Sequence, residues 1–111
     1  MEFNKINSNL LNSFPNAVLV IDKNLKIHFN NNKLKYIKTG SLEEYFSSTN
    51  INVIKSNLDK DASSYTSILS ESYNNKQFFI KMTLSYFEND FYTLFLKDIT
   101  QYHRKSIISK C

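Results

Sequence analysis

The alternation of side chains between Lys76 and Phe87 constrains the fold of this chain more than any other feature. One face of a strand through these residues would carry Phe78, Ile80, Met82, Leu84 and Tyr86, and the opposite face Gln77, Phe79, Lys81, Thr83 and Ser85. A shift by one residue would bury Lys81, so the register of this strand in a sheet is strongly specified. The chain must therefore build its core around a sheet.

Turn residues on both sides of this long strand predict an antiparallel meander. Asn74-Asn75 suits a turn with positive φ, and residues 88–90 form a second polar turn, so strands are expected at Tyr65–Tyr73 and Phe91–Ile99. In the last strand, Tyr92, Leu94 and Leu96 share one face, and Phe91, Thr93 and Phe95 share the other. Because both faces are apolar, both must be covered.

The first third of the sequence predicts a helix followed by a hairpin. Apolar residues recur at helical spacing at Phe3, Ile6, Leu10, Leu11 and Phe14. Pro15 ends this helix. The apolar run 17–21 predicts a strand buried on both faces, and the alternation over 25–29 predicts a second strand that pairs with it after a turn at 22–24.

The middle of the chain predicts three short helices. The first should span Leu34–Ile37 after the asparagines at 30–32, and Gly40 should end it. The second should open at Ser41, which forms a capping-box pattern with Glu44, and continue through Phe46. The third should span about 50–59, where Ile51, Ile54 and Leu58 have helical spacing.

Composition excludes several classes of protein. A length of 111 residues fits one domain, and the single cysteine, Cys111, excludes a disulfide framework and a cysteine-based metal cluster. No apolar run approaches the roughly 18 residues of a spanning helix, and the start of the chain lacks a secretory signal, which predicts a cytoplasmic protein without a membrane partner. The net charge of +4 comes from scattered lysines and one arginine, so no nucleic-acid partner is expected.

No side-chain constellation predicts catalysis or metal binding. His28 lies on the polar face of its strand, where a surface or ion-paired histidine is expected, and His103 is followed by Arg104 instead of an acidic residue. The adjacent carboxylates Glu43 and Glu44 do not face each other on a helix, so they make no acid and base pair. The domain is therefore predicted not to be an enzyme.

Three segments together resemble the PAS family of sensory domains. Residues 14–22, Phe-Pro-Asn-Ala-Val-Leu-Val-Ile-Asp, are similar to the helix, proline and strand that open these domains. Residues 27–31, Ile-His-Phe-Asn-Asn, resemble the strand that ends on an asparagine, with Asn31 at the matched position. Residues 97–100, Lys-Asp-Ile-Thr, resemble the close of the last strand and the start of an output helix. The match spans about residues 10–104.

The resemblance implies an α+β fold with a five-stranded antiparallel sheet in the order 2-1-5-4-3 and short helices on one face. It divides the chain into an amino-terminal amphipathic helix at 1–15, a core at 16–99 and the start of an output helix at 100–111. The leading helix would cover the other face of the sheet or a partner subunit. The dimer interface of a homodimer is accordingly expected at Phe3, Ile6, Leu10, Leu11 and Phe14.

The functional role that the resemblance implies is that of a sensory input domain in a signal-transduction protein. The compact middle and the Leu-Leu-Asn-Ser segment at 10–13 look most like nitrogen-regulation-type sensor histidine kinases. Asp98 and Thr100 would couple the sheet to the output helix and a downstream effector domain. The alternative is a ligand-free dimerisation module of another signalling protein, such as a transcriptional regulator or a diguanylate cyclase.

The sequence is compatible with a small apolar ligand and with no ligand at all. Haem-binding members of the family carry a histidine on the helix that corresponds to Ile51–Asp61, and this segment has none. Members that form a flavin photoadduct need a cysteine there, and Cys111 is far away in the sequence. No cofactor is therefore predicted.

Overall fold

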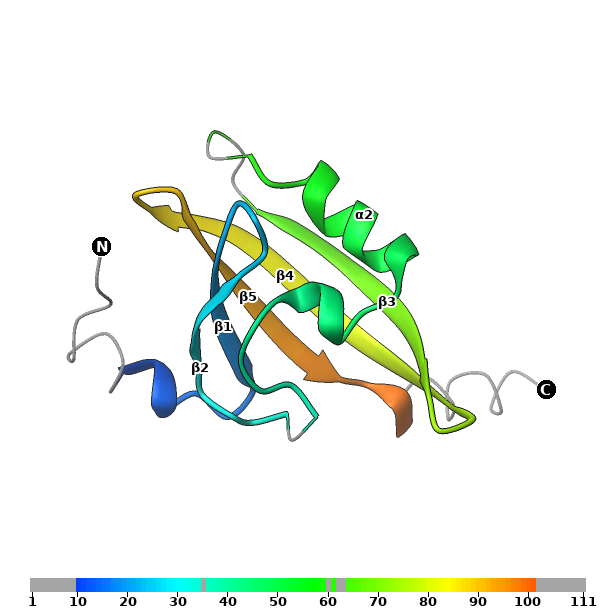
Figure 1. Cartoon of the computed structure of the whole chain (residues 1–111). Helices are drawn as coiled ribbons and strands as arrows, with labels where there is room; N and C mark the ends of the chain where they lie inside the picture. The colour runs from blue at the N-terminus through cyan, green and yellow to red at the C-terminus, as the bar shows by residue number, and fades with distance from the viewer. Residues whose placement is uncertain (1–9, 35, 60, 62–63, 102–111) are drawn as a thin grey trace.

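Five strands form one antiparallel sheet in the order β2-β1-β5-β4-β3 in the computed structural model of the chain (Figure 1). The structure describes residues 10–34, 36–59, 61 and 64–101. The strands are β1 (Ala17–Asp22), β2 (Ile27–Asn30), β3 (Tyr65–Tyr73), β4 (Lys76–Glu88) and β5 (Phe91–Asp98). The α+β architecture and the strand order expected from the sequence are confirmed.

The register of β4 is the one that its alternation predicts. Ile80, Met82 and Leu84 are buried on the inner face, whereas Lys81 is exposed on the outer face. Both flanking hairpins turn through two residues with positive φ, at 51° and 64° for Asn74 and Asn75 and at 51° and 65° for Asn89 and Asp90. Two such residues match the twist of antiparallel strands, so these turns set the pairing of β4 with both neighbours.

The opening hairpin differs from the expectation at one end. Residues 17–21 of β1 are all buried, as predicted, but β2 begins at Ile27 instead of Leu25. The Asp22 carboxylate accepts the backbone N–H groups of Asn24 and Lys26, at 2.9 and 3.0 Å, and Leu25 has a φ of 68°. Leu25 therefore belongs to the turn, where its side chain still enters the core.

The predicted helix at Leu34–Ile37 is wrong, because Leu34, Tyr36 and Ile37 are not helical and the Ile37 N–H donates to the Leu34 carbonyl. The side-chain amide of Asn30 donates to the carbonyls of Ile37 and Lys38, at 2.9 and 2.8 Å. Ile37 is only 1% exposed. Contacts with β2 and the core therefore override the local helical preference.

The other two helices are present with different bounds. A 3₁₀ helix, η1 (Leu42–Glu44), replaces the longer helix expected through Phe46, and the predicted capping box between Ser41 and Glu44 is confirmed. Helix α2 (Ser48–Ser56) begins earlier than expected, because the Ser47 side chain caps it.

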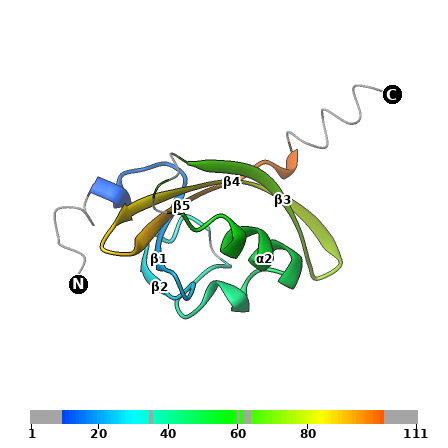
Figure 2. The same cartoon turned by 90° about the horizontal axis from the view of Figure 1, so that it is seen from above.

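The connecting segments with η1 and α2 cover one face of the sheet (Figure 2). Apolar side chains from both layers fill the space between them. Those with the lowest exposure include Leu19, Ile21, Leu25, Ile37, Leu42, Ile54, Ile80, Met82, Leu84, Leu94 and Leu96. The opposite, outer face of the sheet carries Lys81, Thr83 and Phe95, and Phe14 from the segment before β1 lies beside it.

Candidate functional site

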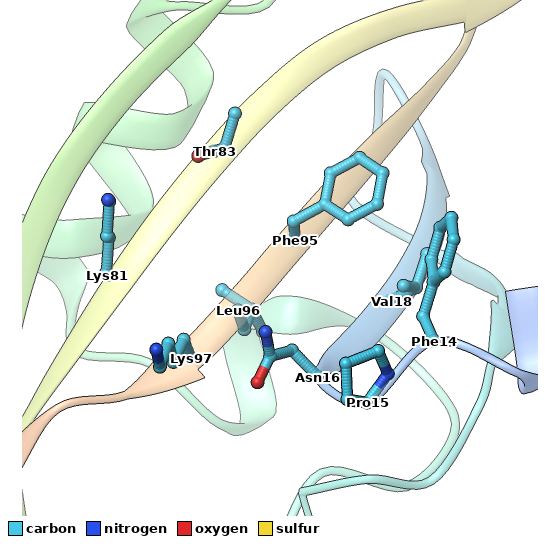
Figure 3. A pocket seen from close by; sticks show the side chains of 9 residues that line it. All are labelled: Phe14, Pro15, Asn16, Val18, Lys81, Thr83, Phe95, Leu96 and Lys97. Carbon is cyan, nitrogen blue, oxygen red and sulfur yellow. The ribbon is translucent and has the colours of Figure 1, made fainter.

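A groove of about 470 Å³ lies on the outer face of the sheet (Figure 3). It is lined by Phe14, Pro15, Asn16, Val18, Lys81, Thr83, Phe95, Leu96 and Lys97. These residues come from the segment before β1 and from β1, β4 and β5, so the groove crosses the centre of the sheet. Figure 3 shows the rings of Phe14 and Phe95 at one end and the lysines at the other.

Aromatic packing closes the end of the groove next to β1. The ring centroids of Phe14 and Phe95 are 5.9 Å apart with an interplanar angle of 46°. Phe95 is the cross-strand partner of Val18, which is fully buried although it points to the outer face. Phe14 thus supplies part of the cover that the apolar outer face of β5 requires.

The residues predicted for a dimer interface are only partly described. Phe3 and Ile6 lie outside the described residues. Leu10 is 60% exposed, and Leu11 and Phe14 are half-buried. A short helical turn at 10–12 carries the two leucines.

Two lysines lie opposite each other in the groove. Lys81 on β4 is the cross-strand partner of Lys97 on β5, and both are exposed. Like charges at directly opposed positions repel, so this pair is unfavourable for the isolated sheet. It makes this end of the groove positively charged.

Asn31 joins the amino-terminal segment to the sheet, which the sequence did not indicate beyond its matched position. Asn31 is only 7% exposed, and its Oδ1 atom accepts the Val18 N–H at 3.0 Å. Its Nδ2 atom donates to the carbonyls of Leu11 and Asn16, at 3.1 and 3.0 Å. One amide therefore holds the end of the leading helix against the start of β1.

Thr100 joins the end of β5 to the neighbouring strand β4. Its hydroxyl donates to the Asp98 carboxylate at 2.5 Å and accepts the backbone N–H of Phe79 on β4 at 3.0 Å. The same Asp98 oxygen accepts the Thr100 N–H at 2.9 Å, and the Ile99 N–H donates to the Phe79 carbonyl at 2.9 Å. The two predicted coupling residues are thus in contact with each other and with the neighbouring strand.

The charged groups around β2 form a separate cluster. The His28 Nε2 atom lies 2.8 Å from Asp22 Oδ2, and the His28 ring packs edge-on against Phe91 at 4.8 Å. Burial opposes ionisation of Asp22, but the hydrogen bonds from His28, Lys26 and Asn24 outweigh it and lower the pKa of Asp22. His28 therefore lies near the surface in contact with a carboxylate, in line with the polar position that the sequence predicted.

Within 10–34, 36–59, 61 and 64–101, no group of three or more His, Cys, Asp or Glu residues could hold a metal ion. None of the helices in this described part of the chain has the length and apolar character needed to cross a bilayer.

Solved structures of PAS domains are similar to this chain. The PAS domain of a two-component sensor histidine kinase aligns with a TM-score of 0.61 and 16% identity, over 85% of this chain and 94% of that chain. The PAS domain of an HTR-like protein from Haloarcula marismortui aligns with a TM-score of 0.59 and 16% identity, over 85% and 95%.

A third similar structure is the PAS domain of BvgS from Bordetella pertussis, with a TM-score of 0.53 and 12% identity, over 96% of this chain and 87% of that chain. No protein-family model matches the sequence, and no curated protein is significantly similar to it. At these identities the likeness shows a shared fold.

Proposed function

From the PAS fold of this chain, we propose that it is a sensory input domain of a signal-transduction protein, and specifically of a sensor histidine kinase. The fold supports this role because a sensor histidine kinase contains one of the similar domains. The nitrogen-regulation type is the subtype that we propose, on the Leu-Leu-Asn-Ser segment at 10–13 alone.

The hydrogen bonds at Thr100 are the observation that carries the proposal. Thr100 follows directly on the end of β5, and its hydroxyl is bonded to the backbone of β4. A shift of β4 relative to β5 must therefore move Thr100 or break its bond to Phe79. Residue 100 also begins a helical turn, so such a shift would be passed to the segment that follows.

A test of this coupling replaces Thr100 by valine in the full-length protein. Valine keeps the shape of the side chain but neither donates to Asp98 nor accepts from Phe79, so autophosphorylation should change in level or in response to signal. Thr66→Val is the matched control, because the Thr66 hydroxyl pairs with that of Thr83 at 3.1 Å, away from the junction. Wild-type output in Thr100→Val, or an equal change in both variants, would refute coupling through Thr100.

Homodimerisation through the leading helix is the second part of the proposal. The exposed Leu10 and the half-buried Leu11 offer an apolar surface beside the groove. Replacing both by aspartate should give folded monomers in sedimentation experiments, because two charges cannot be buried at an interface without partners. Dimers that persist in this double variant would exclude the leading helix as the interface.

A ligand-free dimerisation module is the alternative that the core favours. The interior between sheet and helices is filled by side chains such as Leu19, Ile54 and Leu94, which are fully buried. Such a domain would act in a transcriptional regulator or a diguanylate cyclase through changes in the association of its two subunits alone. A dimer whose output responds to no small molecule would support the dimerisation module over the sensory input domain.

A further inference from the structure

Another cavity, of about 310 Å³, lies at the end of the β3–β4 hairpin, between this hairpin and the segment that leads into η1. Four aromatic side chains and two carboxylates line it: Tyr36, Tyr45, Tyr73, Phe78, Glu44 and Glu71. The volume is at the lower end of the range for small-molecule sites. Neither the proposed dimer surface nor the junction at Thr100 includes any of these residues.

The aromatic rings are held in place by contacts on both sides of the cavity. The rings of Tyr36 and Phe78 are 6.1 Å apart with an interplanar angle of 35°. The Tyr45 hydroxyl donates to the Thr39 carbonyl at 2.6 Å, which leaves the ring as the part available to a ligand. Tyr73 is 63% exposed and stands at the rim.

The two carboxylates are also held by the backbone. Glu44 accepts the Ser41 N–H at 2.8 Å, and Glu71 accepts the Ser47 N–H through both oxygens, at 3.0 and 2.9 Å. Against these two negative charges the cavity has one positive charge, that of Lys38. Burial, and then the charges of Asp98 and Glu71, raise the pKa of Tyr36 to about 12, which agrees with a negative potential at this ring.

We propose that this aromatic cavity binds a small organic ammonium ion. The face of an aromatic ring carries partial negative charge and attracts a cation, and several rings around one cavity add their attraction while they remove water from the ligand. The carboxylates of Glu44 and Glu71 supply the counter-charge. A neutral molecule of the same shape would gain only apolar contact, and an anion would be repelled.

The direct test compares choline with 3,3-dimethylbutan-1-ol, its uncharged isostere, by calorimetric or NMR titration of the purified 111-residue chain. Choline should bind about tenfold more tightly than the alcohol, because only choline gains the cation–π and carboxylate attraction. Equal affinity for the two compounds, or no binding of choline, would overturn the proposal. Binding is measured without any output, so either result leaves the coupling at Thr100 to be judged separately.

Variants at the rim locate the bound cation. Tyr73→Leu should weaken choline binding by about two- to fivefold, since it removes one ring face from an exposed position. Tyr65→Leu is the matched control, because Tyr65 lies on the same face of β3 at its other end, outside this cavity. Unchanged affinity in Tyr73→Leu, or an equal loss in Tyr65→Leu, would contradict binding at this place.

Two charge variants should act in opposite directions. Glu44→Gln removes a negative charge and keeps the capping box, because glutamine can also accept the Ser41 N–H. Choline should therefore bind more weakly to this variant and more tightly to Lys38→Gln, which removes the opposing positive charge. Weaker binding to Lys38→Gln would show that the ligand needs a cation in the wall, and would overturn the proposal of a simple ammonium site.

Discussion

Asn31 Oδ1 accepts the backbone N–H of Val18 at 3.0 Å, across thirteen residues of sequence. The same side chain donates to the carbonyls of Leu11 and Asn16, so its donors and its acceptor are all used. A carboxylate or an apolar side chain of similar size cannot replace this amide, since it donates twice and accepts the N–H groups of Val18 and Lys33. The position of the amino-terminal segment on the sheet depends on it.

Replacing Asn31 by aspartate should lower the free energy of unfolding by about 2 to 3 kcal/mol, because the two carbonyls lose their donor and face a buried charge. Urea denaturation measures the loss. Asn24→Asp, at an exposed turn position, is the control and should change stability little. Equal stability of the two variants would show that the amide of Asn31 does not hold the segment.

Gly40→Ala should destabilise the chain by about 1 to 2 kcal/mol, since Gly40 has a φ of 97° and a side chain is strained in this region. A Cβ atom there would also lie 2.1 Å from Glu44 Oε2, in the carboxylate that closes the capping box. Thermal unfolding followed by circular dichroism checks this. A melting temperature equal to that of wild type would mean that the loop before η1 adapts freely.

Acid should destabilise the chain partly through Asp22. The folded state lowers the pKa of Asp22, so this group stabilises the fold above the unfolded value of about 3.9. That contribution is lost as the pH falls from there through the lowered folded value. Asp22→Asn lacks this titration, so its unfolding free energy should fall less steeply than that of wild type below about pH 4. Parallel curves for the two proteins would contradict the assignment.

Lys81→Glu should stabilise the isolated chain by about 0.2 to 1 kcal/mol, because it converts the opposed pair with Lys97 from like to opposite charges. The gain should shrink in high salt. Denaturant titrations at two salt concentrations measure both effects. Lys81→Gln removes the repulsion without adding an attraction, so it should show part of the gain in stability. A loss of stability in both variants would contradict the prediction and would show that Lys81 supports the sheet through its aliphatic stem.

The sheet could be predicted from the sequence because its signals are local. The alternation over 76–87 fixes which face of the strand is buried, since a shift by one residue would bury Lys81, and Asn74-Asn75 supplies the two positive φ values that a tight hairpin needs. The capping box of Ser41 and Glu44 is equally local and was also predictable. The contacts of Thr100 with Phe79 were not, because they join residues 21 positions apart.

The sequence by itself therefore determined which segments are extended, where the chain reverses and which face of the long strand at 76–87 is buried, because these depend on neighbours within a few residues. Only the tertiary structure decided that Leu34, Tyr36 and Ile37 are not helical, since the contacts of Asn30 and of the core outweigh a small helical preference. It also decided that Tyr36 faces Phe78 in one cavity, because a meeting of residues 42 positions apart is an outcome of sheet packing and has no local pattern.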